Sequence, residues 1–135
     1  MENKNKPKIK GVLLDIEKNA ADVVEFVPTL QEYYRMLHCD CIDIVSRKVG
    51  VKGGRVFDIV CDDEGLFREE NKISAINDMG EAMLVGSLLL LNRGENGEEA
   101  SLTDDDARFI LSNIQKMYTR NHPEGYLMLT QCEIC

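Results

Sequence analysis

The amino-acid sequence predicts an α+β fold: a single domain of about five strands in a mostly antiparallel or mixed sheet, with two helices packed on it. The chain has 135 residues, of which 44% are hydrophobic, so it can bury one core without disulfides or metals. Short runs of Val, Ile and Leu alternate with Gly, Asp and Asn turn signals, as strands require. Two further segments begin with a Thr cap and continue with apolar residues at helical spacing.

The first half of the chain reads as strands around one short helix. Residues 1–8 form a polar leader that we expect to be disordered, and the domain begins at residue 9. The segments 9–14 and 22–27 have strand character, and Pro28 ends the second because proline cannot donate to a ladder. Thr29 and Glu32 form a capping-box pattern, which predicts a helix over 30–38.

The middle of the chain predicts a hairpin and a buried strand. Strands over 41–49 and 55–62 are joined by Gly53-Gly54, which tolerates the positive φ of a tight turn. The acidic string DDEG then signals a second turn, and 67–79 is irregular by pattern. The run AMLVGSLLLL over 82–91 is continuously apolar, which is typical of a central strand covered on both faces.

The last third predicts one long helix. Thr103 caps it, three aspartates occupy its first turn, and apolar residues recur along one side at i, i+3, i+4 and i+7 up to Tyr118. The segment 92–101 before it reads as a loop. The domain is expected to end at residue 120, and the tail 121–135 either adds an edge strand through its YLML string or stays loose.

Four strings carry a family resemblance over residues 9–119. They are VVEFVPTLQEYYRML, DIVCDDEGL, AMLVGSLLLL and SLTDDDARFI, in that order along the chain. Together they resemble domain-of-unknown-function family 3846, small proteins of phages and integrative elements in Firmicutes-type bacteria. The resemblance implies a mobile-element accessory protein, in which role small proteins often counter host defence. It supplies no catalytic residue.

The charge balance restricts the class of partner. The 24 acidic and 16 basic residues give a formal net charge of −8, which argues against direct binding to duplex nucleic acid. Such a balance suits a protein that docks on a basic surface, and it equally suits solubility alone. The chain shows no signal peptide, and its longest apolar run is too short to span a bilayer. We therefore expect a cytoplasmic protein with no membrane contact and with reduced thiols.

Six carboxylates cluster around the start of the last helix and could imitate phosphates towards a basic partner. Equally, the three aspartates have a helix-start role and the glutamates belong to a solvated loop. The candidate residues are Glu95, Glu98, Glu99, Asp104, Asp105 and Asp106.

Four cations surround the glycine turn of the predicted hairpin. Glycine N–H groups flanked by Arg and Lys can hold the phosphate of a small nucleotide or signal molecule. The alternative is that these cations keep the hairpin edge from pairing with other strands. The candidate residues are Arg47, Lys48, Lys52 and Arg55.

Four of the five cysteines offer a zinc hypothesis. Cys39 and Cys41 follow the first predicted helix, and Cys132 and Cys135 close the chain in a CxxC pattern. Tetrahedral zinc favours such donors, although these cysteines could equally be reduced thiols that bind no metal. The carboxylates after Cys61 offer a weaker magnesium hypothesis, since a turn of this composition needs no metal.

The sequence thus favours a non-enzymatic accessory protein that acts by binding, with a host nucleic-acid-targeting defence enzyme as the expected partner, in the manner of an anti-CRISPR or anti-restriction protein. A small-nucleotide binder and a zinc-stabilised interaction module remain alternatives. His38 and His122 have no evident nucleophile to activate, so an enzyme is the minority interpretation. A homodimer stays open, because free strand edges cannot be assigned from pattern.

Overall fold

The computed structural model describes residues 7–51, 53–64 and 72–135, and these residues form mainly β structure. Strands hold 52% of the described residues and helices 14%. The predicted α+β fold with about five strands in one sheet is therefore wrong, because several short strands carry too little periodicity to be seen in the sequence. The elements are β1 (Ile9–Asp15), β2 (Ala20–Phe26), α1 (Leu30–Leu37), β3 (Ile42–Val49), β4 (Arg55–Asp62), β5 (Ile73–Ile76), β6 (Ala82–Val85), β7 (Leu88–Arg93), β8 (Glu99–Ala100), α2 (Asp104–Ser112), β9 (Ile114–Thr119), β10 (His122–Leu129) and β11 (Cys132–Ile134).

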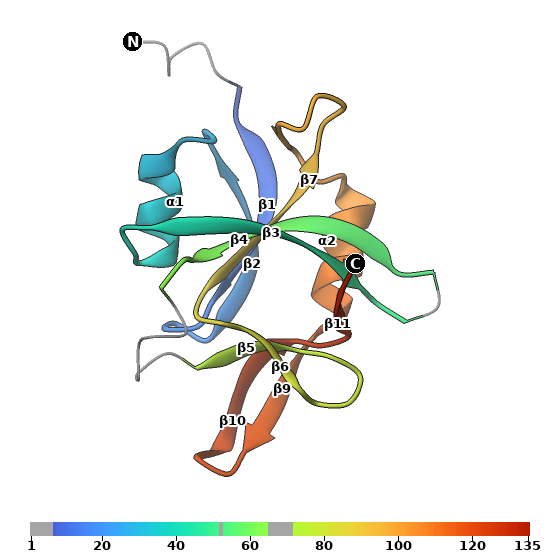
Figure 1. Cartoon of the computed structure of the whole chain (residues 1–135). Helices are drawn as coiled ribbons and strands as arrows, with labels where there is room; N and C mark the ends of the chain where they lie inside the picture. The colour runs from blue at the N-terminus through green and yellow to red at the C-terminus, as the bar shows by residue number, and fades with distance from the viewer. Residues whose placement is uncertain (1–6, 52, 65–71) are drawn as a thin grey trace.

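The strands form two sheets (Figure 1). The larger sheet has the order β11-β3-β4-β7-β1-β2, with β8 pairing the end of β7, and its neighbouring strands are antiparallel. The smaller sheet has the order β6-β5-β10-β9, and its β5–β10 pair is parallel. Two consecutive strands, β6 and β7, lie in different sheets, so the chain crosses between them at Gly86-Ser87.

Strand β7 lies at the centre of the core. Leu88 and Leu90 pack in one hydrophobic cluster, and Leu89 and Leu91 pack in another, because successive side chains point to opposite faces. All four are 0% exposed. This confirms the prediction of a strand buried on both faces for residues 88–91, and it explains why this run is continuously apolar.

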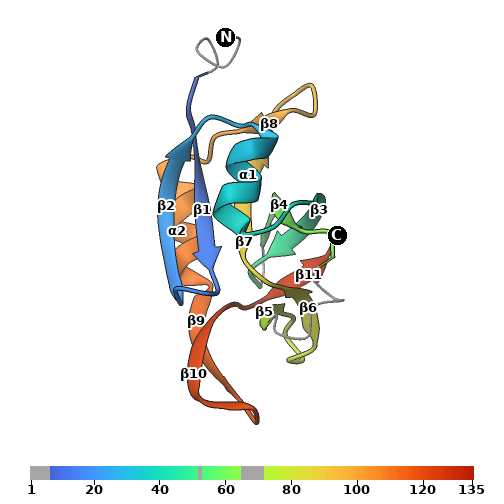
Figure 2. The same cartoon turned by 90° about the vertical axis from the view of Figure 1, so that its left-hand side faces the viewer.

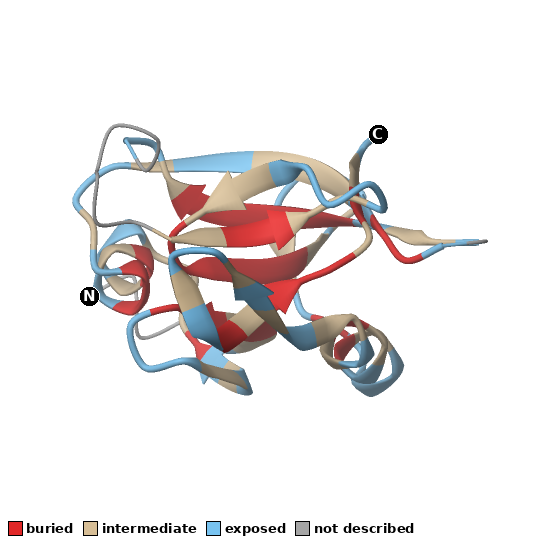
Figure 3. Ribbon diagram, turned by 90° about the horizontal axis from the view of Figure 1, so that it is seen from below, coloured by how far each residue is buried: buried red, intermediate tan, exposed pale blue. Residues whose placement is uncertain are grey.

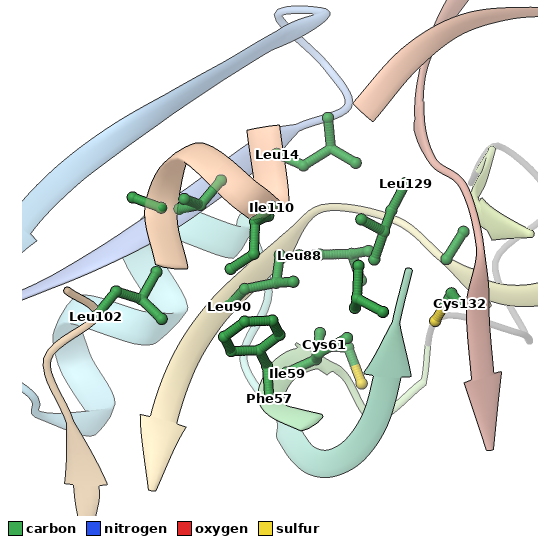
Figure 4. Packing of buried hydrophobic residues seen from close by; sticks show 14 residues of the cluster. Leu14, Phe57, Ile59, Cys61, Leu88, Leu90, Leu102, Ile110, Leu129 and Cys132 are labelled. Carbon is green, nitrogen blue, oxygen red and sulfur yellow. The ribbon is translucent and has the colours of Figure 1, made fainter. Parts of the chain in front are cut away.

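The two helices cover opposite faces of the larger sheet (Figure 1, Figure 2). Helix α1 packs on the Leu89 and Leu91 side, and α2 packs on the Leu88 and Leu90 side together with β10. Figure 3 shows buried residues concentrated in the central strands, with exposed residues on the outer sides of the helices. In the close view of Figure 4, Ile110 of α2 lies beside Leu88 and Leu90.

The predicted strand over 82–91 is interrupted by a sharp turn. Gly86 has a φ of +78° and its N–H donates to the Lys72 carbonyl at 2.9 Å. The buried Ser87 hydroxyl accepts the Ile16 N–H at 3.0 Å, which ties the turn to the end of β1. Since only Gly adopts this φ freely, Gly86 permits the chain to leave one sheet and enter the other.

The predicted long helix ends early, at Ser112, and residues 114–119 form strand β9 instead. Asn113 donates its N–H to the Ile110 carbonyl, while its own carbonyl accepts both the N–H (2.7 Å) and the hydroxyl (2.8 Å) of Thr130. Ile114 then pairs with Leu129 of β10. Tertiary hydrogen bonds from β10 thus replace the helical ones beyond Asn113, although the apolar spacing continues.

The residues after 120 belong to both sheets. The boundary expected at 120 falls in the hairpin between β9 and β10; β10 lies inside the smaller sheet, and β11 is an edge of the larger one. The segment 67–79 was predicted to be irregular, but it contains strand β5. Residues 67–71 of that segment lie outside the described part of the chain.

Of the remaining local predictions, the loop over 92–101 is wrong, because β7 extends to Arg93 and β8 pairs with it. The predicted leader over 1–8 lies outside the described residues up to residue 6. The strands and the helix predicted for the first half of the chain are confirmed. Strands β1 to β4 and helix α1 lie within two residues of their predicted bounds. The Thr29 hydroxyl accepts the Glu32 N–H at 3.3 Å, as the capping pattern requires.

Candidate functional site

Two surfaces hold the charged residues that the sequence singled out. The first, which we call the acidic crest, comprises Glu95, Glu98, Asp104 and Asp105. It combines the β7–β8 hairpin with the first turn of α2, which lie next to each other at one end of the molecule (Figure 1). The Asn92 side-chain amide joins the two segments, since it donates to Asp106 at 2.9 Å and to the Ser101 carbonyl at 3.3 Å.

Both segments of the acidic crest are held by local hydrogen bonds. The Gly94 N–H donates to the Glu98 carbonyl at 2.7 Å, and Gly97 turns the hairpin with a φ of +84°. The Thr103 hydroxyl accepts the Asp106 N–H at 3.0 Å and caps the helix as predicted. The carboxylates of the acidic crest therefore stand on fixed backbone, and those in the first helical turn also interact favourably with the helix dipole.

Two of the six predicted carboxylates turn inward. Glu99 accepts the Tyr33 hydroxyl at 3.2 Å, and burial together with this charge raises the pKa of Tyr33. The Asn92 amide, the Thr103 cap and a nearby arginine hold the pKa of Asp106 below its usual range. Glu99 and Asp106 thus stabilise the fold, whereas the four residues of the acidic crest are exposed.

Arg55, a predicted anion ligand of the hairpin, is bound to the base of the acidic crest. Its Nη1 donates to Asp105 at 2.9 Å and to Asp106 at 3.0 Å. Its guanidinium carbon lies 4.3 Å from the centre of the Phe109 ring, which is a cation–π distance. Arg55 therefore binds the first turn of helix α2, 50 residues away in the sequence, and does not point into the glycine turn.

The other hairpin cations do not converge either. Arg47 and Lys48 are consecutive on β3, so their side chains point to opposite faces of the sheet. Lys52 lies outside the described residues. The described part of the hairpin therefore offers no common phosphate cradle formed by these cations.

Arg47 instead lines the second surface, which we call the Arg47 cavity. It has a volume of about 190 Å³ and lies between the larger sheet and strand β6. Two walls enclose it: one from β3 and the end of β4, the other from β6. The lining residues are Asp43, Val45, Arg47, Cys61, Asp62, Asp63, Met83, Leu84 and Val85.

The polar groups of the Arg47 cavity are unevenly satisfied. Arg47 Nη1 donates to the Ser46 carbonyl at 2.9 Å, whereas its Nε is buried and has no hydrogen-bond partner among the described residues. The Cys61 thiol donates weakly to the Asp43 carbonyl at 3.6 Å. Burial, with the charge of Asp43 adding to it, raises the pKa of this thiol to about 11, so it is protonated at neutral pH.

The four cysteines of the zinc hypothesis do not meet. Cys132 pairs with Val49 at one end of β3, while Cys41 precedes Ile42 at the other end. A strand of this length spans roughly 25 Å, whereas zinc–sulfur bonds are about 2.3 Å. Within 7–51, 53–64 and 72–135, no three His, Cys, Asp or Glu side chains are grouped closely enough to hold a metal ion, which includes the carboxylates after Cys61.

Sequence reasoning missed two charged clusters that depend on long-range pairing. His38 ends α1 with a φ of 56°, and its Nε2 lies 3.4 Å from a carboxylate oxygen of the buried Asp15. Arg93 donates from Nε and Nη2 to both oxygens of the buried Asp58, which also accepts the Ser46 hydroxyl. The single charged residue, Asp58, within the apolar stretch VFDIVC of β4 was the available signal for the second cluster.

The family model that matches this chain is described as a domain of unknown function, DUF3846, and it covers residues 9–119. The chain belongs to this family. The matched DUF3846 region runs from the start of β1 to the end of β9, so it contains both the acidic crest and the Arg47 cavity, whereas β10 and β11 follow it. No curated protein and no solved structure matches the chain. None of the helices in the described residues has the length and apolar character needed to cross a membrane.

Proposed function

We propose that this DUF3846 protein is a non-catalytic accessory protein of a phage or other mobile element, and that it acts in the cytoplasm by binding a host protein. The proposal is supported by the acidic balance of the chain and above all by the acidic crest. Four carboxylates gather there at one end of the molecule, on backbone that is fixed before any partner arrives. A basic surface on the partner fits this arrangement.

The exposure of the acidic crest is the observation that carries the proposal. The side chains of Asp104 and Asp105 are 77% and 70% exposed, and both glutamates of the hairpin are exposed. A surface with preformed geometry loses little conformational entropy on binding. Charged rims of this kind mainly raise the association rate and select the partner.

Cations near the acidic crest do not block such contacts. Lys10 lies 3.4 Å from Asp104, and Arg108 lies 4.0 Å from Asp105; the Lys10 side chain is 42% exposed and the other three are at least 70% exposed. Exposed pairs of this kind contribute about 0–1 kcal/mol, so a partner's arginine or lysine can share or displace them. Only Arg55, which packs on Phe109 and holds two aspartates, is a structural cation of this surface among the described residues.

We further propose that the partner is a nucleic-acid-targeting defence enzyme. Such an enzyme needs a basic groove for its substrate, and an acidic protein can occupy that groove in place of phosphates. This class of partner predicts that binding weakens as salt concentration rises and that nucleic acid competes with the protein.

The test compares capture of host proteins by the wild type and by the Glu95→Gln, Glu98→Gln double variant. The two substitutions leave the helix cap intact, and the amide oxygen of the new side chain at position 98 can still accept the Asn96 N–H. The matched control is Asp22→Asn with Glu25→Gln, two exposed carboxylates of β2. We expect a nuclease that is retained by the wild type and the control, lost with the double variant, and inhibited by the wild type in a cleavage assay. Equal capture by all three proteins would reject the acidic crest as the binding surface.

The other two functions find less support in the geometry. Arg47, Lys48 and Arg55, the hairpin cations within the described residues, diverge, which argues against the convergent site that a nucleotide binder needs. Cys39 and Cys41 precede β3, whereas Cys132 pairs with the far end of that strand, which argues against a zinc-stabilised module.

A further inference from the structure

We propose that the Arg47 cavity binds a small linear zwitterion, with a carboxylate or phosphoryl group at the Arg47 end and an amine at the Asp43 end. The cavity shares no residue with the acidic crest, so this inference goes beyond the proposed function and does not depend on it.

The two ends of the cavity differ in charge because of strand geometry. Asp43, Val45 and Arg47 occupy alternate positions of β3 and therefore line the same face. At about 3.3 Å per residue, the Cα atoms of Asp43 and Arg47 are roughly 13 Å apart. Asp63 joins the Asp43 end, since its N–H donates to the Cys41 carbonyl just before β3 at 3.1 Å. One end of the cavity is thus anionic and the other cationic.

The middle of the cavity is apolar. Val45 lies between the two charged positions on β3, and Met83, Leu84 and Val85 of β6 form the other wall. A ligand that matches these walls has a hydrocarbon chain between its charged groups. An α-amino acid alone does not fit this description, because its ammonium and carboxylate are attached to the same carbon.

Arg47 gives the independent reason to expect a ligand. Its Nε is a buried donor with no acceptor among the described residues, and a buried unsatisfied donor costs about 1–3 kcal/mol. An apolar side chain in this position would avoid that cost, so the presence of a guanidinium here calls for an explanation. A carboxylate or phosphoryl group beside the guanidinium would offset, through its charge, the cost of keeping this cation at the cavity wall; the buried Nε itself is not the atom that the ligand would reach.

The size of the cavity limits the ligand further. A volume of about 190 Å³ equals the liquid volume of roughly six water molecules, and it lies below the range of about 300–1,000 Å³ that holds drug-sized ligands. A nucleotide is therefore too large. A linear ω-amino acid such as 6-aminohexanoate has suitable length, an apolar middle and both charges.

The experiment measures binding of 6-aminohexanoate by calorimetry, beside hexanoate and hexylamine, which each lack one charged end. We expect the zwitterion to bind at least tenfold more tightly than either. In wild-type protein labelled on its methionine methyl groups, NMR should show a shift of the Met83 signal, which lines the cavity, and none of Met79, which is 80% exposed elsewhere. This readout needs no variant, so it stays informative if a substitution impairs folding.

Two variants and one control then assign the ends. Arg47→Gln should remove the preference for the zwitterion over hexylamine, and Asp43→Asn should remove its preference over hexanoate. Lys48→Gln is the matched control, because it removes a neighbouring charge from the opposite face of β3. The proposal is overturned if none of the three probes shows saturable binding at about 10 mM, which is ten times a millimolar dissociation constant. It is also overturned if hexylamine binds as tightly as the zwitterion, or if Arg47→Gln keeps the wild-type preference for the zwitterion over hexylamine.

Discussion

Gly50→Ala should destabilise the protein by about 2–5 kcal/mol, because two separate costs arise at this position. Gly50 ends the β3 side of the hairpin with a φ of +96°, and its N–H donates to the Gln131 carbonyl at 2.9 Å. It also lies against helix α2: a Cβ atom added there would stand 2.5 Å from Cζ of Phe109. That ring supports Arg55, so the substitution reaches the base of the acidic crest.

The two costs can be estimated separately. A non-glycine residue in the left-handed region costs about 1–2 kcal/mol. Overpacking adds about 1–3 kcal/mol if Phe109 cannot move away freely, and the ring also packs at 6.4 Å from Phe57. Gly53→Ala is the matched control: its φ is +76°, and nothing lies within 4 Å of an added Cβ atom. The control therefore carries the conformational cost alone.

Urea unfolding of the wild type and both variants gives the free energies. We expect Gly50→Ala to be less stable than Gly53→Ala by about 1–3 kcal/mol, with similar m values. Restoring space with Phe109→Leu in the Gly50→Ala background should recover part of the loss. If the two glycine variants unfold at the same urea concentration, the close approach of Phe109 to Gly50 contributes nothing, and the reasoning fails.

Two further predictions concern buried groups. Arg93→Met should lower the free energy of unfolding by about 2–3 kcal/mol, because Asp58 is only 7% exposed and loses a bidentate partner. Asp58→Asn in the same background should recover part of that loss. Unchanged stability of Arg93→Met in urea unfolding would contradict the prediction. Burial raises the pKa of Cys61 and of Cys132 from 9.0 to about 11, so the folded state retains protons that the unfolded state releases. The stabilisation from these two thiols is fully present below pH 9 and is lost as pH rises towards 11. Replacing both cysteines by Ala should make the urea midpoint fall less steeply over this pH range. An equally steep fall in the double variant would show that other groups cause it.

Local signals were sufficient where an element depends on its own residues. The Thr29 cap and the spacing of Tyr33 and Leu37 specify α1, and the continuous apolar run specifies β7 as a strand buried on both faces. Gly86 is a local signal for a turn within 82–91, but the sequence does not show that the two halves of this segment enter different sheets. That the turn moves the chain into another sheet depends on partners distant in sequence, namely the Lys72 carbonyl and the Ile16 N–H.

The helix prediction failed where a distant strand competes with local periodicity. Ile114 and Met117 continue the apolar spacing of α2, so the sequence favours a helix there. The structure pairs both residues with β10, opposite Leu129 and Tyr126. Nothing near residue 113 in the sequence announces that Thr130 will bind its carbonyl, and this long-range contact decides the outcome.

Arg55 shows why charged sites are harder to predict than strands. In the sequence it is a neighbour of the hairpin glycines, and grouping cations by sequence distance assigns it to an anion site. In the fold, register and helix packing place it between Phe109 and two aspartates of α2, so it binds the base of the acidic crest. The same contacts join the hairpin to α2 as one unit, since Gly50 admits the Phe109 ring on which Arg55 lies. We therefore expect a change at Gly50 to reach Asp105 through Phe109 and Arg55, neither of which lines the Arg47 cavity.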